Sequence, residues 1–110
     1  MIILIFLKMN GKLIFSQIIK RNGDVVSFNK EKIENAIFKA TRAIGRPDRS
    51  KANRLSAEVL KKLSELPVQG LPSVELVQDY VERVLFEDGD FQLAKAYILY
   101  RKQRELVRNT

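Results

Sequence analysis

The first third of the chain carries short runs of β-branched and aromatic residues, broken by two Asn-Gly pairs. Such runs are typical of strands. Asn-Gly is favoured in two-residue hairpin turns, because both positions take positive φ. The apolar runs lie at residues 2–6, 13–15, 18–19 and 25–28. The pattern predicts a meander of about three short strands, with turns at Asn10-Gly11 and Asn22-Gly23.

After this first third, apolar residues recur with the period of an α-helix. Asn29 can cap the first helix by accepting a hydrogen bond from an early backbone N–H, and Gly45 ends it. A second helix is predicted to begin at Asp48 or Ser50 and to end before Pro67. The predicted inward faces of these two helices are Ile33, Ala36, Ile37, Ala40 and Ile44, and then Leu55, Val59, Leu63 and Leu66.

Two more helices follow a short segment, residues 68–72, that proline breaks and that suits the edge of a sheet. Ser73 is predicted to cap the third helix. After a turn at Gly89, Asp90 is predicted to cap the fourth. The predicted inward faces are Leu76, Val77, Tyr80, Val81, Val84 and Leu85 on the third helix, and Phe91, Ala94, Tyr97 and Ile98 on the fourth.

Together these elements predict an α+β fold, with a small antiparallel β cap of about three strands on a bundle of about four α-helices. The 110 residues fit one domain. The apolar run at residues 1–7 is shorter than the ~20 residues that a membrane span needs. No basic region precedes it, as it would in a signal peptide. We therefore expect an added strand there, in a cytoplasmic protein with no membrane partner.

Cysteine and histidine are absent from the sequence, which removes several classes of function. Without them there is no disulfide and no zinc ribbon. Ser-His and Cys-His nucleophilic catalysis are excluded in the same way. The chain also has no glycine-rich GxxxxGK[ST] loop and no acidic pair that stands out for Mg²⁺. We therefore do not expect an enzyme, and a nucleotidyl or phosphoryl transferase is disfavoured.

The formal net charge of +7 favours an anionic partner, such as nucleic acid, a free nucleotide or an acidic surface. Lys20 and Arg21 stand just before the second Asn-Gly turn. A lysine offers a point charge and an arginine a planar fork, and both suit phosphate oxygens. The residues alone leave two interpretations open: a solvated hairpin tip, or one side of a phosphate site.

The start of the first helix adds to the second interpretation. Asn29 and Lys32 lie where free backbone N–H groups favour an anion. Ile18 and Ile33 could supply an apolar wall for a purine. Cations beside such a wall are the combination that a bound nucleotide needs.

Three segments resemble one known family. KRNGDVVSFNKEKIENAIFKA, residues 20–40, resembles the opening of an ATP-cone domain. SVELVQDYVE, residues 73–82, resembles the third-helix segment of that family, and AKAYILYR, residues 94–101, resembles its closing helix. The resemblance covers about residues 18–104, with the segments in the family's order. We therefore divide the chain into an N-terminal strand extension, 1–17, and an ATP-cone-like nucleotide-binding domain, 18–110.

The resemblance implies an allosteric regulatory module whose effector is ATP or dATP, with or without Mg²⁺. Nucleotide occupancy would control self-association or a partner such as a ribonucleotide reductase. It also implies a helical bundle under a small β cap, as the hydrophobic pattern predicts. Carried over by position, the nucleotide-binding residues are Ile18, Lys20, Arg21, Asn29, Lys32, Ile33, Ser73 and Lys102.

A different class of function stays open beside this one. The net charge and the basic last helix also suit a small nucleic-acid-binding or transcription-regulatory protein. Against that class, the chain has no recognised reading motif, and its basic residues are spread over several elements.

Overall fold

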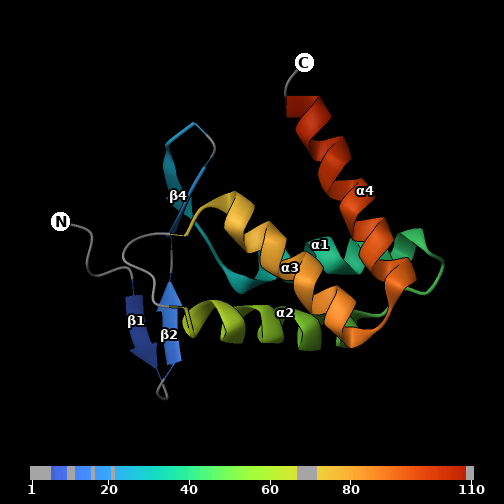
Figure 1. The fold of residues 1–110 in the computed structure, drawn as a ribbon, viewed down its shortest axis with the longest axis horizontal. Helices are drawn as coiled ribbons and strands as arrows, with labels where there is room; N and C mark the ends of the chain where they lie inside the picture. Colours follow the sequence, from blue (N-terminus) through green and yellow to red (C-terminus); the bar gives the residue numbers. More distant parts are fainter. Residues whose placement is uncertain (1–5, 10–11, 16, 21, 67–71, 109–110) are drawn as a thin grey trace.

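The computed structural model describes residues 6–9, 12–15, 17–20, 22–66 and 72–108. Strands come first and helices follow, as Figure 1 shows. The predicted α+β class is therefore confirmed. The elements are β1 (Phe6–Met9), β2 (Lys12–Phe15), β3 (Gln17–Ile19), β4 (Val25–Ser27), α1 (Lys30–Ala43), α2 (Arg49–Ser64), α3 (Val74–Asp88) and α4 (Phe91–Arg108).

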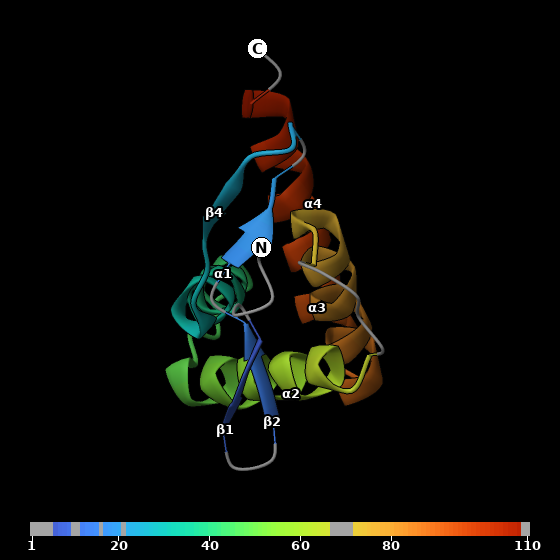
Figure 2. The same ribbon diagram turned by 90° about the vertical axis from the view of Figure 1, so that its left-hand side faces the viewer.

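The strands form two separate antiparallel hairpins, β1–β2 and β3–β4, in place of the predicted single meander. The outer edge of β3 explains the difference. Ile19 donates its N–H to the Pro72 carbonyl at 3.0 Å and forms a parallel bridge with Ser73. This edge of β3 is therefore occupied by the chain just before α3, and β2 lies beside α2 instead (Figure 2). Residues 68–71 of the predicted edge segment lie outside the described residues.

The turn between β3 and β4 forms as predicted. Gly23 has φ +94°, and its N–H donates to the Lys20 carbonyl at 2.9 Å. The side-chain oxygen of Asn22 accepts from the Asp24 N–H at 3.0 Å. Both features explain why Asn-Gly suits this position. The other predicted turn, Asn10-Gly11, lies outside the described residues.

Each helix begins directly after a polar cap residue, which was predicted as a cap for α1, α3 and α4; for α2, predicted to begin at Asp48 or Ser50, the cap is Asp48. In all four caps a side-chain oxygen accepts a hydrogen bond from the backbone N–H three residues later, at 2.9 to 3.2 Å. Such a bond satisfies one of the amides that a helix start leaves unpaired. The caps are Asn29, Asp48, Ser73 and Asp90.

The helices pack in a ring, in which α1 contacts α2, α2 contacts α3, α3 contacts α4 and α4 returns to α1. The apolar faces predicted for α1, α2 and α3 supply most of the core. The largest fully buried apolar side chains are Ile37, Leu55, Val59, Val81, Leu85 and Leu93. Among the described helices, none combines the length and the apolar character that a membrane crossing requires.

The inward face predicted for α4 is partly wrong. Phe91 was expected in the core but is 65% exposed, whereas Leu93 is fully buried together with Ala94 and Tyr97. Phe91 is the first residue of α4, so its ring projects from the end of the bundle and meets Phe86, with ring centroids 6.0 Å apart. Leu93 lies four residues before Tyr97, which places both on one face of the helix.

Asp90 joins the start of α4 to α2 and to the end of α1. Its carboxylate accepts hydrogen bonds from Lys51 Nζ at 2.6 Å and from Arg46 at 3.2 Å. The bond from Lys51 lowers the pKa of Asp90 to about 2, and the contact with Arg46 adds to this against the effect of burial. The charged form is therefore the one that stabilises the fold.

Replacing Asp90 by asparagine keeps the cap but removes this charge, and it should lower the free energy of unfolding by about 1–2 kcal/mol at neutral pH. Because the folded pKa lies below the ordinary value of 3.8, the contribution is present above about pH 4 and is lost as the pH falls toward 2. Urea denaturation of both proteins at neutral pH and near pH 2 measures the difference. Asp48→Asn, at a cap without a described ion pair, is the control, and a pH-independent Asp90→Asn effect would contradict the assignment.

Candidate functional site

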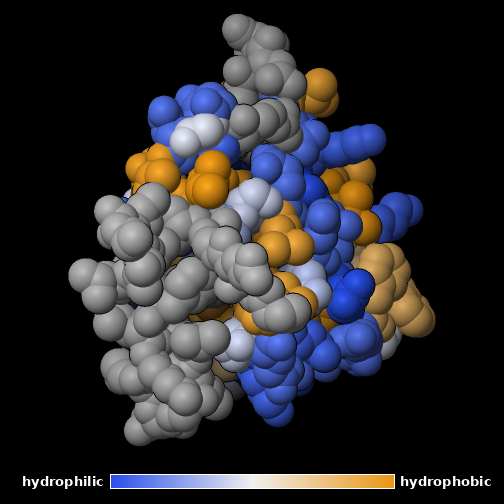
Figure 3. Space-filling model, turned by 60° about the vertical axis from the view of Figure 1, so that its left-hand side comes forward, coloured by the Kyte–Doolittle hydropathy of each residue, from blue (hydrophilic) through white to orange (hydrophobic). Residues whose placement is uncertain are grey.

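A pocket of about 250 Å³ opens between α1, α3, α4 and the β3–β4 hairpin. In Figures 1 and 2 the hairpin and the last turns of α4 both rise past the start of α3 on the same side of the molecule. Figure 3 shows apolar atoms exposed among polar ones on the side that carries the hairpin. The lining residues are Ile18, Phe28, Lys32, Ile33, Ala36, Val74, Val77, Gln78, Val81, Tyr97, Tyr100, Arg101 and Arg104.

Helical periodicity explains why these residues meet. On α3 and again on α4 the lining positions follow the spacing i, i+3, i+4, i+7, which is one face of a helix. Most of the α3 positions are apolar, whereas α4 contributes two tyrosines and two arginines. The lining sets are Val74, Val77, Gln78 and Val81 on α3, and Tyr97, Tyr100, Arg101 and Arg104 on α4.

The interior of the pocket is apolar. Ile18 from β3 and Ile33 from α1 are buried, and Val77 of α3 is buried with them. Tyr97 also lines the pocket, with its ring centroid 6.4 Å from that of Tyr100. Burial raises the pKa of Tyr97, so its hydroxyl stays protonated. These surfaces can hold a flat, uncharged ring system.

Cations stand at the rim. Lys32 on α1 and Arg104 on α4 are exposed and line the pocket. Lys32 donates through Nζ to the Ser27 carbonyl at 3.3 Å, which holds it beside the hairpin. Within the described part of the chain, neither Lys32 nor Arg104 has a carboxylate partner. The rim therefore carries positive charge that an anion can neutralise.

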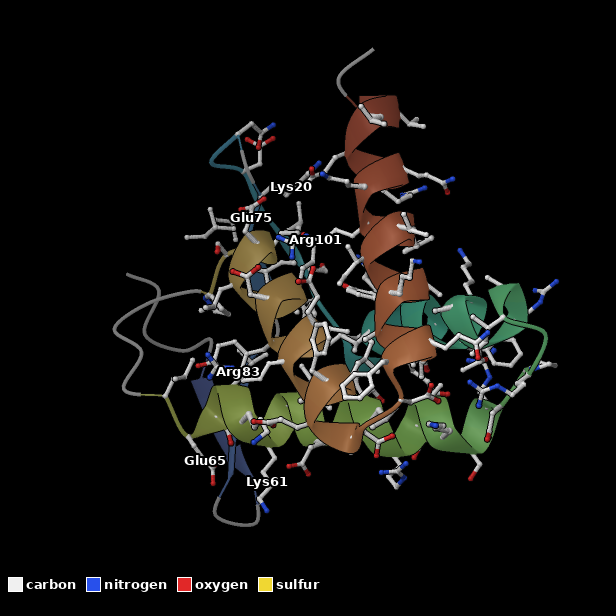
Figure 4. All side chains as sticks on the ribbon, turned by 45° about the vertical axis from the view of Figure 1, so that its right-hand side comes forward. Lys20, Lys61, Glu65, Glu75, Arg83 and Arg101 are labelled. Atoms are coloured by element: carbon white, nitrogen blue, oxygen red, sulfur yellow. The ribbon has the colours of Figure 1, made fainter. Side chains whose placement is uncertain are left out.

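Arg101 has a different role, because its charge is already paired. It donates to Asp79 at 2.9 Å and to Glu82 at 2.6 Å, both on α3. Burial works to lower the pKa of Arg101, but the hydrogen bonds to both carboxylates outweigh it and raise the pKa. Figure 4 shows Arg101 between α3 and α4. Arg101 thus fixes the two walls of the pocket relative to each other.

Gln78 provides a polar group inside the pocket. Its Oε1 is buried and accepts no hydrogen bond from any described residue. An unpaired buried acceptor costs about 1–3 kcal/mol. A ligand with a donor at this point would remove that penalty.

Comparison with known proteins identifies the family. The model of the ATP cone domain matches residues 16–106. The chain belongs to the ATP-cone family. It is 39% identical over 97 residues to a vitamin B12-dependent ribonucleoside-diphosphate reductase of Thermoplasma acidophilum, and the match covers 84% of this chain and 12% of that protein.

Other relatives are reductases too. A ribonucleoside-diphosphate reductase subunit alpha of Chlamydia muridarum is 38% identical over 101 residues, which is 84% of this chain and 10% of the relative. An anaerobic ribonucleoside-triphosphate reductase of Salmonella typhimurium is 34% identical over 91 residues, covering 83% of this chain and 12% of the relative. The chain therefore spans about a tenth of the length of the reductases that it matches.

Several of the residues predicted to bind nucleotide meet at the pocket of this ATP cone. Ile18, Lys32 and Ile33 line it. Asn29 and Ser73 lie at the starts of α1 and α3, where each side chain serves as a helix cap and neither lines the pocket. Two predicted apolar residues and one predicted cation therefore line the same pocket, and their contact with a nucleotide stays a prediction.

Of the two hairpin cations, Lys20 lies within the described residues. Lys20 is exposed, directly before the turn, and its N–H donates to the Asp24 carbonyl at 2.7 Å. It does not line the pocket, although Figure 4 places it on the hairpin at the level of Glu75 in the first turn of α3. Arg21 lies outside the described residues. Both assignments remain predictions.

Lys102 lies away from the pocket, and Arg104 lines it instead. Each residue turns about 100° around a helix of 3.6 residues per turn. Two positions therefore separate Lys102 and Arg104 by about 200°, onto nearly opposite sides of α4. Sequence reasoning also missed Gln78 and Arg101. The helical spacing of these residues with their neighbours on α3 and α4 is visible in the sequence. It indicates a site only once one knows which faces of the two helices meet.

Proposed function

We propose that this ATP cone binds ATP or dATP in the pocket between α1, α3, α4 and the β3–β4 hairpin, and that it acts as an allosteric regulatory module. Family membership supports this, and so does one observation above all: an apolar pocket whose rim cations, Lys32 and Arg104, have no carboxylate partner among the described residues. The module itself catalyses no reaction. It works in the cytoplasm, where its nucleotide is found.

The purine occupies the apolar interior. Ile18 and Ile33 contact one side of the ring, and Val77 contacts the other. The volume of about 250 Å³ is near the lower end of ligand pockets, about 300–1,000 Å³. It therefore suits the base and sugar, with the phosphates outside. The exocyclic amino group of adenine donates to Gln78 Oε1, whereas guanine presents an acceptor at the equivalent position.

The phosphates lie at the cationic rim. Lys32 and Arg104 approach them from opposite walls, and Lys20 and Arg21 add charge from the hairpin. Arginine and lysine together suit a triphosphate, because one offers a planar fork and the other a point charge. We propose Mg²⁺ only as an ion bound to the phosphates of the nucleotide, because oxygen atoms are its preferred ligands.

The regulated protein is a ribonucleotide reductase, or a further copy of the chain. The reductase names of the relatives support this choice. Nucleotide joins elements that are far apart in sequence, so the free and bound forms would differ in how the hairpin and α4 sit. A ligand can shift such an equilibrium only by its difference in affinity for the two forms.

Calorimetric titration of the whole chain with ATP, dATP and GTP tests the proposal. We expect saturable binding of ATP or dATP in the micromolar range, with GTP at least about tenfold weaker because it leaves Gln78 unpaired. Size-exclusion chromatography with and without nucleotide checks for a change of oligomeric state. Absence of ATP and dATP binding would overturn the proposal, and salt-sensitive DNA binding in its place would favour the nucleic-acid alternative.

A further inference from the structure

A second hollow lies on the outer side of the molecule, between α1 and α4. This groove, which we call the α1–α4 groove, has a volume of about 480 Å³. Among the described residues, Tyr100 alone lines both this groove and the pocket described above, and it forms part of the wall between the two. The groove is lined by Lys39, Ala40, Ala43, Ile44, Gln92, Lys95, Ala96, Leu99, Tyr100 and Gln103.

The floor of the groove is apolar and made of small side chains from both helices. Alanines at positions 40, 43 and 96 leave the space open. Leu99 stands at the edge of this space and is 54% exposed. Full burial of a leucine side chain contributes about 1.5–3 kcal/mol. A partner that covers half-exposed Leu99 and the apolar floor beside it would gain part of this free energy, so this surface suits a partner.

Beyond the groove, this surface continues along α4 as a stripe of two leucines and two lysines. Lys95, Leu99, Lys102 and Leu106 follow the spacing i, i+4, i+7, i+11, so they share one side of the helix. Leu106 is 66% exposed. Basic and apolar side chains therefore alternate along about 16 Å of α4, at 1.5 Å per residue. This length corresponds to three turns of a partner helix.

The charge of the surface identifies the chemistry of the partner. Lys39 and Lys95 line the groove, Lys102 belongs to the stripe, and the described lining residues include no carboxylate. Glu105 of α4 lies instead on the side of Arg101, with a separation of 3.9 Å. A second copy of the chain docked through this same surface would bring lysines against lysines, so the surface disfavours it.

We propose that the α1–α4 groove and the stripe beside it bind an acidic amphipathic helix of a partner protein. Apolar side chains of that helix, spaced at three and four residues, enter the groove beside Leu99 and Leu106. Its carboxylates face Lys39, Lys95 and Lys102. This also gives Lys102 a role on the side of α4 where it lies. The proposal stands whether or not the other pocket binds a nucleotide.

A labelled synthetic peptide of about four helical turns tests it, with leucines at i, i+4, i+7 and i+11 and glutamates beside them. Fluorescence anisotropy on the whole chain measures the dissociation constant. We expect micromolar binding. Binding should be at least about tenfold weaker for a peptide with lysine in place of glutamate, and for a scrambled peptide of the same composition. The scrambled peptide controls for attraction by the net charge alone.

Variants of the chain locate the binding. Leu99→Asp should weaken the glutamate peptide at least about tenfold. Phe86→Asp should leave it within about twofold, because Phe86 is an exposed apolar residue of α3 and lies outside the groove. Circular dichroism confirms that both variants fold. Three results would overturn the proposal: no saturable binding of the glutamate peptide, equal binding of the scrambled peptide, or a wild-type dimer that Leu99→Asp converts to monomer.

Discussion

Replacing Arg104 by alanine is expected to weaken ATP binding by about 10- to 100-fold, the range of a charged hydrogen bond lost from a ligand. Arg104 lines the pocket, is exposed to solvent and has no carboxylate partner among the described residues. Its whole charge is therefore available to a phosphate. Lys32→Ala removes the cation on the opposite wall and should act in the same direction. Calorimetric titration of each variant with ATP measures the loss.

Lys102→Ala is the matched control. It removes the same charge from the same helix, two residues away, but on the side of α4 that faces away from the pocket. We expect ATP affinity within about twofold of the wild type, since a distant surface charge is screened by salt. An equal loss in Lys102→Ala and Arg104→Ala would mean that overall charge governs binding. Wild-type affinity in both Arg104→Ala and Lys32→Ala would remove the pocket assignment.

Features that depend on neighbouring residues were predicted from the sequence, whereas features that depend on distant residues were not. Helix caps such as Asn29 and Asp90 were predicted correctly because a cap depends on a few neighbouring residues. The Asn22-Gly23 turn was predicted correctly for the same reason. The pairing of β3 was not, since the edge that it offers to β2 is taken by Pro72, more than fifty residues later.

The residues of the candidate site likewise fall into those close together in sequence and those on separate helices. Ile18, Lys32 and Ile33 lie within one hairpin and the helix after it, and all three line the pocket. Their contact with a nucleotide stays a prediction. Gln78 and Arg104 belong to helices whose relative rotation no local pattern specifies. The family resemblance implied Lys102, whereas Arg104, two positions later on α4, is the basic residue that lines the pocket. Only the packing of α4 against α3, fixed by the ion pairs of Arg101, distinguishes them.

Packing also determines which apolar residue of α4 supports the fold. Leu93→Ala is expected to lower the free energy of unfolding by about 2–5 kcal/mol, because it leaves a cavity in a fully buried position. Phe91→Ala removes a larger side chain, but one that is 65% exposed and whose ring lies beside that of Phe86. We expect its effect to stay below about 1 kcal/mol. Urea denaturation of the two variants and the wild type gives both values.

The comparison tests the rotation of α4 directly. Hydrophobicity alone favours Phe91 as the core residue, whereas the structure assigns that role to Leu93, on the same face as Tyr97. A larger loss in Phe91→Ala than in Leu93→Ala would require α4 to be rotated about its axis. Arg104 and Lys102 would then exchange sides, since a rotation that buries position 91 also turns position 102 inward. The stability of these two variants therefore bears on the nucleotide site as well as on the core.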